Sequence, residues 1–524
     1  MFKKLNRFLY TLYRLKPSQI FYQILNRLNL LSLFQKKFKV DNISSSDIID
    51  WNFLSPTTKF YPSKKLLVFL NKKYEFKDEV DWNFSEYGKL WTYNLNYLDF
   101  INQDNLDHNK INDLLRNYLS RYKQLKDGFD PYPTSIRIIN LSKLISSLPE
   151  TDSSAYKILT RDIRRLSSNL EKHLLGNHLL ENLLALWVGN HFIKNKDLAV
   201  FLNKKLIYEL DEQILKDGAH YELSPMYHQI ILGRLLECIS LAKNNPNEWN
   251  QTILSVFINK SEVMLSWLKN ISFNFTHFIR INDSVEGISP NYKDLLKLSK
   301  KLNLHIKPIS LGDSNIRKLS KGNLSMLIDL SNISPSYQPG HSHSDALNFL
   351  LFYRNTPIIV DPAISTYEKN KSRDRERSSC YHNIVVRNNE NHDEIWGSFR
   401  VGRSSKTKIL KENKNNFKAI KKGYDKNISH QREWIAEENG ISIIDVIANT
   451  REDHDLYLHF HPNLFIDMEN DKLIIDNKIE IQFQYHKKIE IVDYFYAKGF
   501  NNKVNAKRAK IQFKQHLVTS INKK

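Results

Sequence analysis

Apolar residues recur at the spacing of an α-helix from about residue 90 to residue 305. In one such series Leu114, Leu115, Tyr118 and Leu119 share a helical face, because steps of three and four residues follow the helical turn. Short polar breaks such as residues 126–128, Lys-Asp-Gly, separate successive series. A run of helical hairpins of similar length is typical of a bundle or an α/α toroid.

From about residue 320 the hydrophobic period shortens towards two. Segments such as ALNFLLFYR, PIIVD and KIEIVDYFYA are short, rich in β-branched and aromatic residues, and bounded by Asn, Asp, Gly or Lys. Many such segments in series, without helices between them, predict an antiparallel β-sandwich. The change of period falls between residues 307 and 321. We therefore predict a multidomain α+β chain with a helical domain at 41–310 and a sandwich at 311–524.

Residues 1–40 form a separate basic and amphipathic segment. Polar residues including Arg7, Arg14 and Lys16 interrupt its apolar positions, so no cleavable signal peptide is legible. The segment either packs as a helix on the main body or makes peripheral contact with an anionic membrane. No stretch reaches the roughly 18 to 20 apolar residues of a membrane span. We expect a cytoplasmic or inner-membrane-associated protein, with the periplasm as the alternative.

Charge and cysteine content narrow the classes of partner and fold. With 77 Lys and Arg against 57 Asp and Glu, the net charge of the 524 residues is +20. This surplus favours a polyanionic partner, whether nucleic acid, an anionic membrane or an acidic polysaccharide. No nucleic-acid-binding motif is present, so nucleic acid is not expected. The only cysteines, Cys238 and Cys380, fall in different predicted domains, which argues against a disulfide framework.

Two clusters with candidate chemistry lie in the helical region. In GNHLLEN (176–182), Asn177, His178 and Glu181 share a face if the segment is helical. They can grip a carboxylate or orient a catalytic ring, although Asn177 alone is also a good helix cap. In DGAHYELSPMYH (217–228), Ser-Pro marks a helix start and places Tyr227 in the first turn. This phenol is either a proton-transfer group or part of the core.

Two further clusters lie at the strands. His341 and His343 of GHSHSD point to one face of a strand, which suggests metal ligation or a ligand beside a catalytic base. With Asp361, which ends PIIVD, and His382, His343 completes a two-nitrogen, one-oxygen set that suits zinc. The arginines of the following loop either clamp a carboxylate or sulfate or are simply solvated; they are Arg373, Arg375 and Arg377.

These four clusters, in this order, resemble the heparinase II/III-like family of polysaccharide lyases, which includes related alginate lyases. The resemblance extends from about Trp91 to Arg403. It is most specific in GHSHSDALNFLLFYRNTPIIVDPAISTY, with NHLLENLLAL, DGAHYELSPMYH and PYPTSIRIIN as counterparts in the helical region. It implies an N-terminal α/α toroid, an incomplete barrel of helical hairpins, packed on an antiparallel β-sandwich with a cleft between them.

The resemblance also implies roles for the residues. Asn177 and His178 neutralise a uronate carboxylate, Tyr227 acts as acid and often as base, and His341 is the other proton-transfer group. Tyr221 is the fallback for Tyr227. A structural zinc ion is implied at His343, Asp361 and His382. Further substrate-binding residues are expected to be Glu181, Tyr221, Glu222, Arg137, Asn140 and Arg375.

The expected activity is cleavage of uronate-containing glycans by β-elimination. Hydrogen-bond donors at the carboxylate stabilise the dianion that forms when the C5 proton leaves, and an acid protonates the departing oxygen. The alternatives are a glycan-binding or assembly protein without turnover and a zinc-dependent hydrolase. The segment LYRLKPSQIFYQILNRL resembles family members that accompany capsule or exopolysaccharide production, which favours a self-made glycan. The identity of the polymer, endo- or exo-action and oligomeric state stay open.

Overall fold

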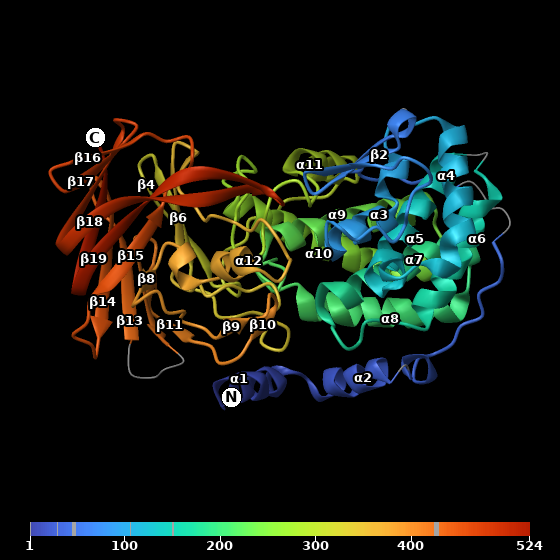
Figure 1. The fold of residues 1–524 in the computed structure, drawn as a ribbon, viewed down its shortest axis with the longest axis horizontal. Helices are drawn as coiled ribbons and strands as arrows, with labels where there is room; N and C mark the ends of the chain where they lie inside the picture. Colours follow the sequence, from blue (N-terminus) through green and yellow to red (C-terminus); the bar gives the residue numbers. More distant parts are fainter. Residues whose placement is uncertain (1, 29, 44–48, 105, 149–150, 424–428) are drawn as a thin grey trace.

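The computed structural model describes residues 2–28, 30–43, 49–104, 106–148, 151–423 and 429–524. A helical domain is followed along the chain by an antiparallel β domain, and the two lie end to end in an elongated molecule (Figure 1). The predicted fold class, an α/α toroid followed by a β-sandwich, is confirmed. The last helix of the first domain ends at Lys301, and the first strand of the second begins at Ile316.

The toroid is built from antiparallel helices around one apolar core. Side chains of Asp107, Asp152, Asn195, Ser224 and Asn247 cap helices by accepting hydrogen bonds from backbone N–H groups of the first turn, as such residues commonly do. The helices are α3 (Lys89–Tyr97), α4 (His108–Arg121), α5 (Pro131–Ser147), α6 (Ser153–Ser167), α7 (Gly176–Ile193), α8 (Lys196–Gln213), α9 (Pro225–Asn244), α10 (Glu248–Ile271) and α11 (Tyr292–Lys301).

Short elements complete this half of the molecule. A small antiparallel sheet precedes α3, and its three- and four-residue strands are too short to give a clear periodic signal in the sequence. The strands are β1 (Lys59–Tyr61), β2 (Leu66–Phe69) and β3 (Lys72–Glu75). The short 3-10 helices of the whole chain are η1 (Leu31–Leu33), η2 (Pro62–Lys64), η3 (Asp99–Asn102), η4 (Tyr122–Gln124), η5 (Asp127–Phe129) and η6 (Ser379–Tyr381).

A buried ion pair joins α5 to α6 and includes Arg137, one of the expected substrate-binding residues. The Arg137 guanidinium donates to both carboxylate oxygens of Asp162, each at 2.8 Å, and to the carbonyls of Asn96 and Gly128. Both charged side chains are fully buried. Asn140, one turn further along α5, is also buried, and its amide donates to the carbonyl of Tyr97. Arg137 therefore holds the toroid together and has its donors engaged internally, so we do not assign it to substrate.

The β domain consists of two packed sheets. Apolar side chains of both sheets, for example Met326 and Leu351 from one and Trp434 and Ile443 from the other, share one core. The four-stranded sheet has the order β4 (Ile316–Lys321), β5 (Leu324–Asp329), β6 (Phe349–Tyr353), β7 (Thr356–Ile359). The larger antiparallel sheet has the order β11 (Lys406–Asn413), β12 (Asn416–Lys422), β13 (Ser429–Ala436), β14 (Gly440–Ala448), β19 (Asn502–Lys523), β18 (Ile479–Gly499), β17 (Lys472–Ile475), β16 (Ile466–Glu469). β15 (His454–His459) pairs with β19 and with β8 (Val385–Val386). A separate two-stranded sheet is formed by β9 (Ile395–Trp396) and β10 (Arg400–Val401). The short helix α12 spans Lys371–Glu376.

The long β18–β19 hairpin reaches from the sandwich to the toroid (Figure 1). Phe500 at its tip packs against Met226 and Tyr227 at the start of α9. The carbonyl of Phe500 accepts a hydrogen bond from the side chain of Asn71 at 2.9 Å, and the side-chain amide of Asn501 donates to the carbonyl of Leu70 at 3.0 Å. The hairpin thus fixes the two domains against each other beside Tyr227.

Two helices near the start of the chain form a second connection, which we call the strap. They are α1 (Phe2–Arg14) and α2 (Pro17–Arg27), and they run along one long side of the molecule (Figure 1). Arg14 donates to the carbonyl of Gly402 in the β domain at 2.7 Å, and Gln19 donates to the carbonyl of Leu174 in the toroid at 3.2 Å. Among the residues that the structure describes, no helix combines the length and apolar character needed to cross a bilayer.

Candidate functional site

A buried carboxylate, Asp283, joins the two domains in the loop between α10 and α11. Its oxygens accept hydrogen bonds from Nδ1 of His341 and Nε2 of His343, each at 2.8 Å, and from the guanidinium of Arg373. Burial alone raises the pKa of a carboxyl, but the charge of Arg373 and the two imidazole hydrogen bonds hold the pKa of Asp283 well below its ordinary value. Asp283 is therefore an anion that fixes three side chains of the β domain.

The backbone around Asp283 is held from both sides. The side chain of Asn282 accepts from the backbone N–H of His343 at 3.0 Å and donates to the carbonyl of Leu223 at 3.1 Å. The hydroxyl of Ser224, which caps α9, donates to the carbonyl of Asp283 at 2.6 Å. Asn282 has φ of 54°, a left-handed conformation that Asn tolerates better than most residues. The loop thus connects the start of α9 to the His-x-His segment.

Tyr227 and His341 meet across the domain boundary. Ser224 caps α9 and Pro225 opens it, which places Tyr227 in the first turn as the sequence predicts. The ring of Tyr227 lies 4.2 Å from that of His341, centroid to centroid, and its hydroxyl is 3.1 Å from the hydroxyl of Tyr367. Tyr227 of the toroid therefore lies in direct contact with His341 and Tyr367 of the β domain, and all three side chains can carry a proton.

The contact with Asp283 decides which nitrogen of His341 is available. An ionised carboxylate only accepts hydrogen bonds, so Nδ1 of His341 carries the proton in this contact, and in the neutral imidazole the lone pair is on Nε2. Nε2 faces the Oε2 atom of Glu222 at 4.0 Å. Burial raises the pKa of Glu222, although His341, the backbone N–H of Asn177 and His178 act in the opposite direction. This shift favours the neutral acid at Glu222.

The start of α7 supplies further polar groups with unused hydrogen-bonding capacity. The backbone N–H of Asn177 donates to Oε1 of Glu222 at 3.2 Å. Among the described residues, buried Oδ1 of Asn177, Oε2 of Glu222 and Oε1 of Gln338 have no hydrogen-bond partner. Unpaired buried polar atoms are costly, so this cluster is suited to a polar ligand.

Gly176 makes the approach of these groups feasible. Its φ is +61°, and a Cβ atom at this position would lie 2.2 Å from Oε1 of Gln338 and 2.9 Å from Oε1 of Glu222. Only glycine adopts this backbone conformation without steric cost and leaves room for both side chains.

His178 lies beside this cluster and remains partly accessible. Its Nδ1 atom is 3.0 Å from Oε1 of Glu171, its ring lies 4.7 Å from that of Tyr132, and 27% of its side chain is exposed. Burial lowers the pKa of an imidazole, but the charge and hydrogen bond of Glu171 outweigh it, so the pKa of His178 is raised. The protonated, cationic form of His178 is consequently favoured at this partly exposed position beside the cluster.

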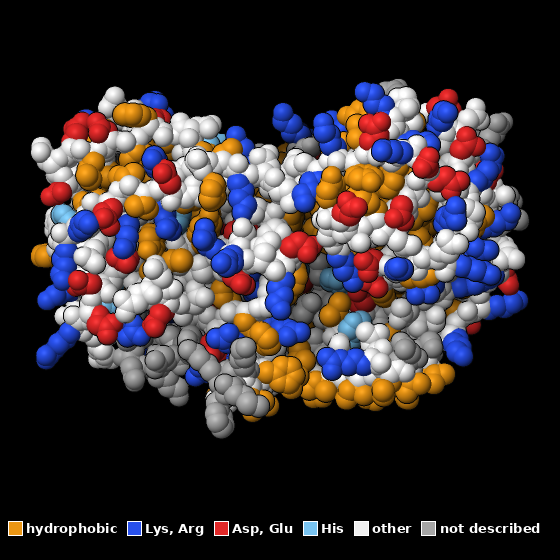
Figure 2. All heavy atoms as spheres, viewed as in Figure 1, with side chains coloured by type: hydrophobic (Ala, Val, Ile, Leu, Met, Phe, Trp, Pro, Cys, Tyr) orange, Lys and Arg blue, Asp and Glu red, His pale blue; other side chains and the backbone are white. Residues whose placement is uncertain are grey.

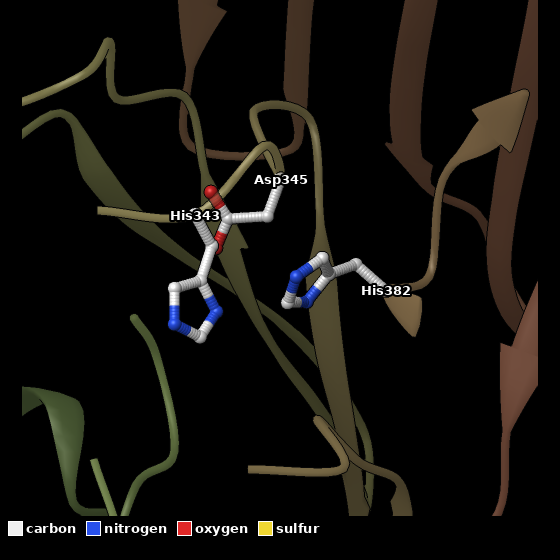
Figure 3. Close-up of side chains that lie close together, drawn as sticks. All are labelled: His343, Asp345 and His382. Carbon is white, nitrogen blue, oxygen red and sulfur yellow. The ribbon is translucent and has the colours of Figure 1, made fainter. Parts of the chain in front are cut away.

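A group of buried side chains with metal-ligand chemistry lies next to Asp283. His343, Asp345 and His382 each offer a ligand atom within 4.8 Å of the others (Figure 3). Nδ1 of His343, Oδ2 of Asp345 and Nε2 of His382 are buried without a hydrogen-bond partner among the described residues. Burial raises the pKa of Asp345 to about 7 and lowers that of His343 to about 4. At His382 burial is outweighed by the charge and hydrogen bond of Asp361, which raise the pKa of this imidazole. Two imidazole nitrogens and one carboxylate oxygen without hydrogen-bond partners form a ligand set that fits zinc.

The acid in this group is not the one expected from the sequence. Asp361 was the predicted oxygen ligand, but its Oδ2 accepts a hydrogen bond from Nδ1 of His382 at 2.7 Å and another from Asn348. It thus lies behind His382, as Asp283 lies behind His343. Carboxylates in such positions orient metal-bound imidazoles. Sequence spacing alone does not separate Asp345 from Asp361, because both are buried acids close to the histidines.

Three more of the predicted substrate-binding residues lie outside this constellation. Glu181 pairs with Arg234 at 2.7 Å inside the toroid, and the hydroxyl of Tyr221 receives a hydrogen bond from that of Tyr337 at 3.3 Å. Arg375 is exposed on α12, whereas Arg373, two positions earlier on this helix, points inward to Asp283. The structure thus brings together Asn177, His178, Glu222, Tyr227 and His341 and leaves Arg375 at the surface.

Sequence reasoning missed Asp283 and Tyr367. Asp283 occurs in IRINDSV, a loop sequence without periodicity or a recognisable motif. Tyr367 stands in the quoted segment PAISTY, so its position was visible while its contact with Tyr227 was not. For Arg373, the helical geometry of residues 371–376 was the missing information, because it decides which arginine of the loop points inward.

Comparison with known proteins gives two family models and several solved structures. The model described as "Heparinase II/III-like, C-terminal" matches residues 307–523, and "Heparinase II/III N-terminus" matches residues 162–301. A crystal structure of heparinase III is similar over 97% of this chain and 92% of its own, with 15% identity and a TM-score of 0.66. The crystal structure of a heparan sulfate lyase HepC mutant from Pedobacter heparinus is similar over 86% of this chain and 80% of its own chain, with 13% identity and a TM-score of 0.57. Among curated proteins, none matches the chain in sequence.

The crowding at Gly176 leads to a stability prediction with a matched control. Gly322 has a similar φ of +56°, but a Cβ atom there meets nothing within 4 Å. Gly322→Ala therefore carries only the conformational penalty, on the order of 1 kcal/mol, whereas Gly176→Ala also displaces Gln338 and Glu222. We expect a clearly larger loss of unfolding free energy for Gly176→Ala, measured by chemical denaturation. Equal losses in the two variants would contradict the described packing.

Proposed function

Because the chain belongs to the heparinase II/III-like family, we propose that it is a polysaccharide lyase that cleaves uronate-containing glycans by β-elimination. The observation that carries the proposal is the meeting of Tyr227 from the toroid with His341 from the β domain, 4.2 Å apart. Beside them lie polar atoms of Asn177 and Glu222 that lack partners among the described residues. The net charge of +20 supports an acidic polymer as substrate.

The first chemical requirement is to stabilise charge at the uronate carboxylate. Removal of the C5 proton places a second negative charge on this group, and preorganised donors in a buried site lower the barrier. The Asn177 amide and the His178 imidazole, whose pKa is raised, are the proposed donors. Glu222 is a third, since burial favours its neutral form and a neutral carboxyl can donate a hydrogen bond to a carboxylate.

The second requirement is a base and an acid on the same sugar. His341 is the proposed base, because Asp283 occupies Nδ1 and leaves the lone pair of Nε2 available. Tyr227 is the proposed acid. Burial, with Tyr367 and Asp283 nearby, raises the pKa of Tyr227 well above its ordinary value, which keeps the phenol protonated until the departing oxygen takes its proton. Tyr367 then lies in position to return a proton to Tyr227.

We further propose that His343, Asp345 and His382 hold a structural zinc ion. When bound, the ion would neutralise Asp345 and fix the two imidazoles. The role of this chain's residues is positional: His343 is two residues from His341, and both donate to Asp283. Rigid placement of His343 therefore also restricts the ring of His341.

Substitution of the proposed acid provides the main functional test. We expect Tyr227→Phe to reduce turnover by a factor of about 10²–10⁴, the usual contribution of a general acid, with an unchanged melting temperature. Turnover is followed by the ultraviolet absorbance of the unsaturated product, with a panel of heparan-type, alginate-type and capsular uronate polymers. Tyr208→Phe, on the exposed surface of α8, serves as the control. A fully active Tyr227→Phe enzyme would rule out the assignment of the acid.

The zinc proposal is tested by metal analysis. We expect His343→Ala and Asp345→Asn to lose zinc in elemental analysis and to melt at lower temperature. His108→Ala, at an exposed position, should keep the wild-type zinc content. Chelation of the wild type should lower the melting temperature before turnover is lost, because the ion takes no part in the reaction. Immediate loss of turnover in a protein that stays folded would instead favour the zinc-hydrolase alternative.

A further inference from the structure

The first helix of the strap turns its polar face to the protein and its apolar face to the solvent, the reverse of the usual arrangement. Its polar residues Thr11 and Arg14 face the β domain: Thr11 accepts a hydrogen bond from Nε1 of Trp396 at 3.2 Å, and Arg14 donates to the carbonyl of Gly402 and the hydroxyl of Ser404. The opposite face is apolar and exposed. Its side chains are 36% to 89% accessible and follow helical spacing: Leu5, Phe8, Leu9, Leu12 and Tyr13.

The second helix of the strap repeats this arrangement. Gln19 is buried and donates to the carbonyl of Leu174, while Lys16, just before the helix, pairs with Glu212 at 2.8 Å. Ile20, Phe21 and Ile24 point away from the toroid and are 39% to 52% exposed. In Figure 2 hydrophobic side chains follow the edge of the molecule that carries α2.

This orientation calls for an apolar partner. A surface helix of a soluble protein normally turns its apolar stripe to the core, and monomers rarely expose a contiguous apolar surface of this kind without a function. Here hydrogen bonds from polar side chains tie both helices to the main body with their apolar stripes outward. The exposed stripe is thus a consequence of specific contacts.

The charge of the segment indicates which partner. Residues 1–40 contain nine Lys and Arg and no Asp, Glu or His. A second copy of the same face would bring like charges together, whereas anionic lipid head groups complement them. Helices with an apolar face and basic residues lie in the plane of such an interface.

We propose that the strap docks the protein on an anionic membrane surface. The outward faces of α1 and α2 insert among the lipids. Basic residues of the segment other than Arg14 and Lys16, which are bound to the main body, contact the head groups. Because α1 is bound to the β domain and α2 to the toroid, both domains are held at the surface. The long axis of the molecule then runs along the membrane, since the strap follows this axis (Figure 1).

The test is flotation of the full chain with lipid vesicles. Vesicles of phosphatidylcholine alone are compared with vesicles of equal parts phosphatidylcholine and phosphatidylglycerol. We expect binding to the anionic vesicles only, weakened by salt because head-group attraction is screened. Failure to float with anionic vesicles, or equal flotation with both kinds, would overturn the proposal without recourse to any variant.

Paired substitutions locate the docking surface. Leu9→Glu combined with Ile24→Glu should weaken binding to anionic vesicles about tenfold or more, because charges enter the apolar stripe. The control, Phe465→Glu with Met468→Glu, changes two exposed apolar residues of the β domain by the same charge and should bind as wild type. Equal weakening in both pairs would contradict the proposal. So would a wild-type dimer, seen by light scattering, that only the strap variant dissociates, since a second copy would then be the partner.

Discussion

The arrangement of the site depends on one buried carboxylate. Asp283 belongs to a loop of the toroid, but its hydrogen-bond partners His341, His343 and Arg373 belong to the β domain. Burying an unpaired carboxylate costs several kcal/mol, so the toroid loop is stable in this position only when the β-domain residues surround it. The same interaction therefore joins the domains, sets the tautomer of His341 and orients His343 towards the metal-ligand group.

The remaining features of the site extend from this centre. Ser224 holds the backbone of Asp283 and also caps the helix that carries Tyr227, so the phenol and the imidazole are placed by one short segment. Phe500, at the tip of the long hairpin, packs against Tyr227. Gly402, which accepts a hydrogen bond from Arg14 of the strap, directly follows β10, and Phe399, whose ring lies 5.9 Å from that of His341, directly precedes it. The strap and the site thus contact the same short segment, residues 399–402.

The sequence predicts the order of the domains well, because helical and strand periodicities differ over long stretches. It also predicts Tyr227 in the first turn of its helix. It places His341 and His343 in a strand, whereas residues 341–343 lie in a loop before β6, and the two rings meet at Asp283 through this loop. It does not distinguish Arg373 from Arg375 or Asp345 from Asp361, since these choices depend on how separate segments pack. It does not reveal the buried pairing of Arg137 with Asp162 either, because Asp162 lies on the next helix. The apolar face of α1 is exposed, whereas such faces are usually buried. The periodicity of the sequence therefore predicts the apolar face but does not show that it points away from the protein.

The central claim is that Asp283 prepares His341 for proton transfer. Its most direct test is the turnover of Asp283→Asn on the polymer that the wild type cleaves, with the melting temperature measured alongside. Glu286→Gln, an exposed acid three residues away that pairs with Arg280, is the matched control. The account predicts that folded Asp283→Asn loses activity by about 10² or more, the scale of a general-base contribution, while the control is unaffected. A folded Asp283→Asn protein as active as the control would contradict it.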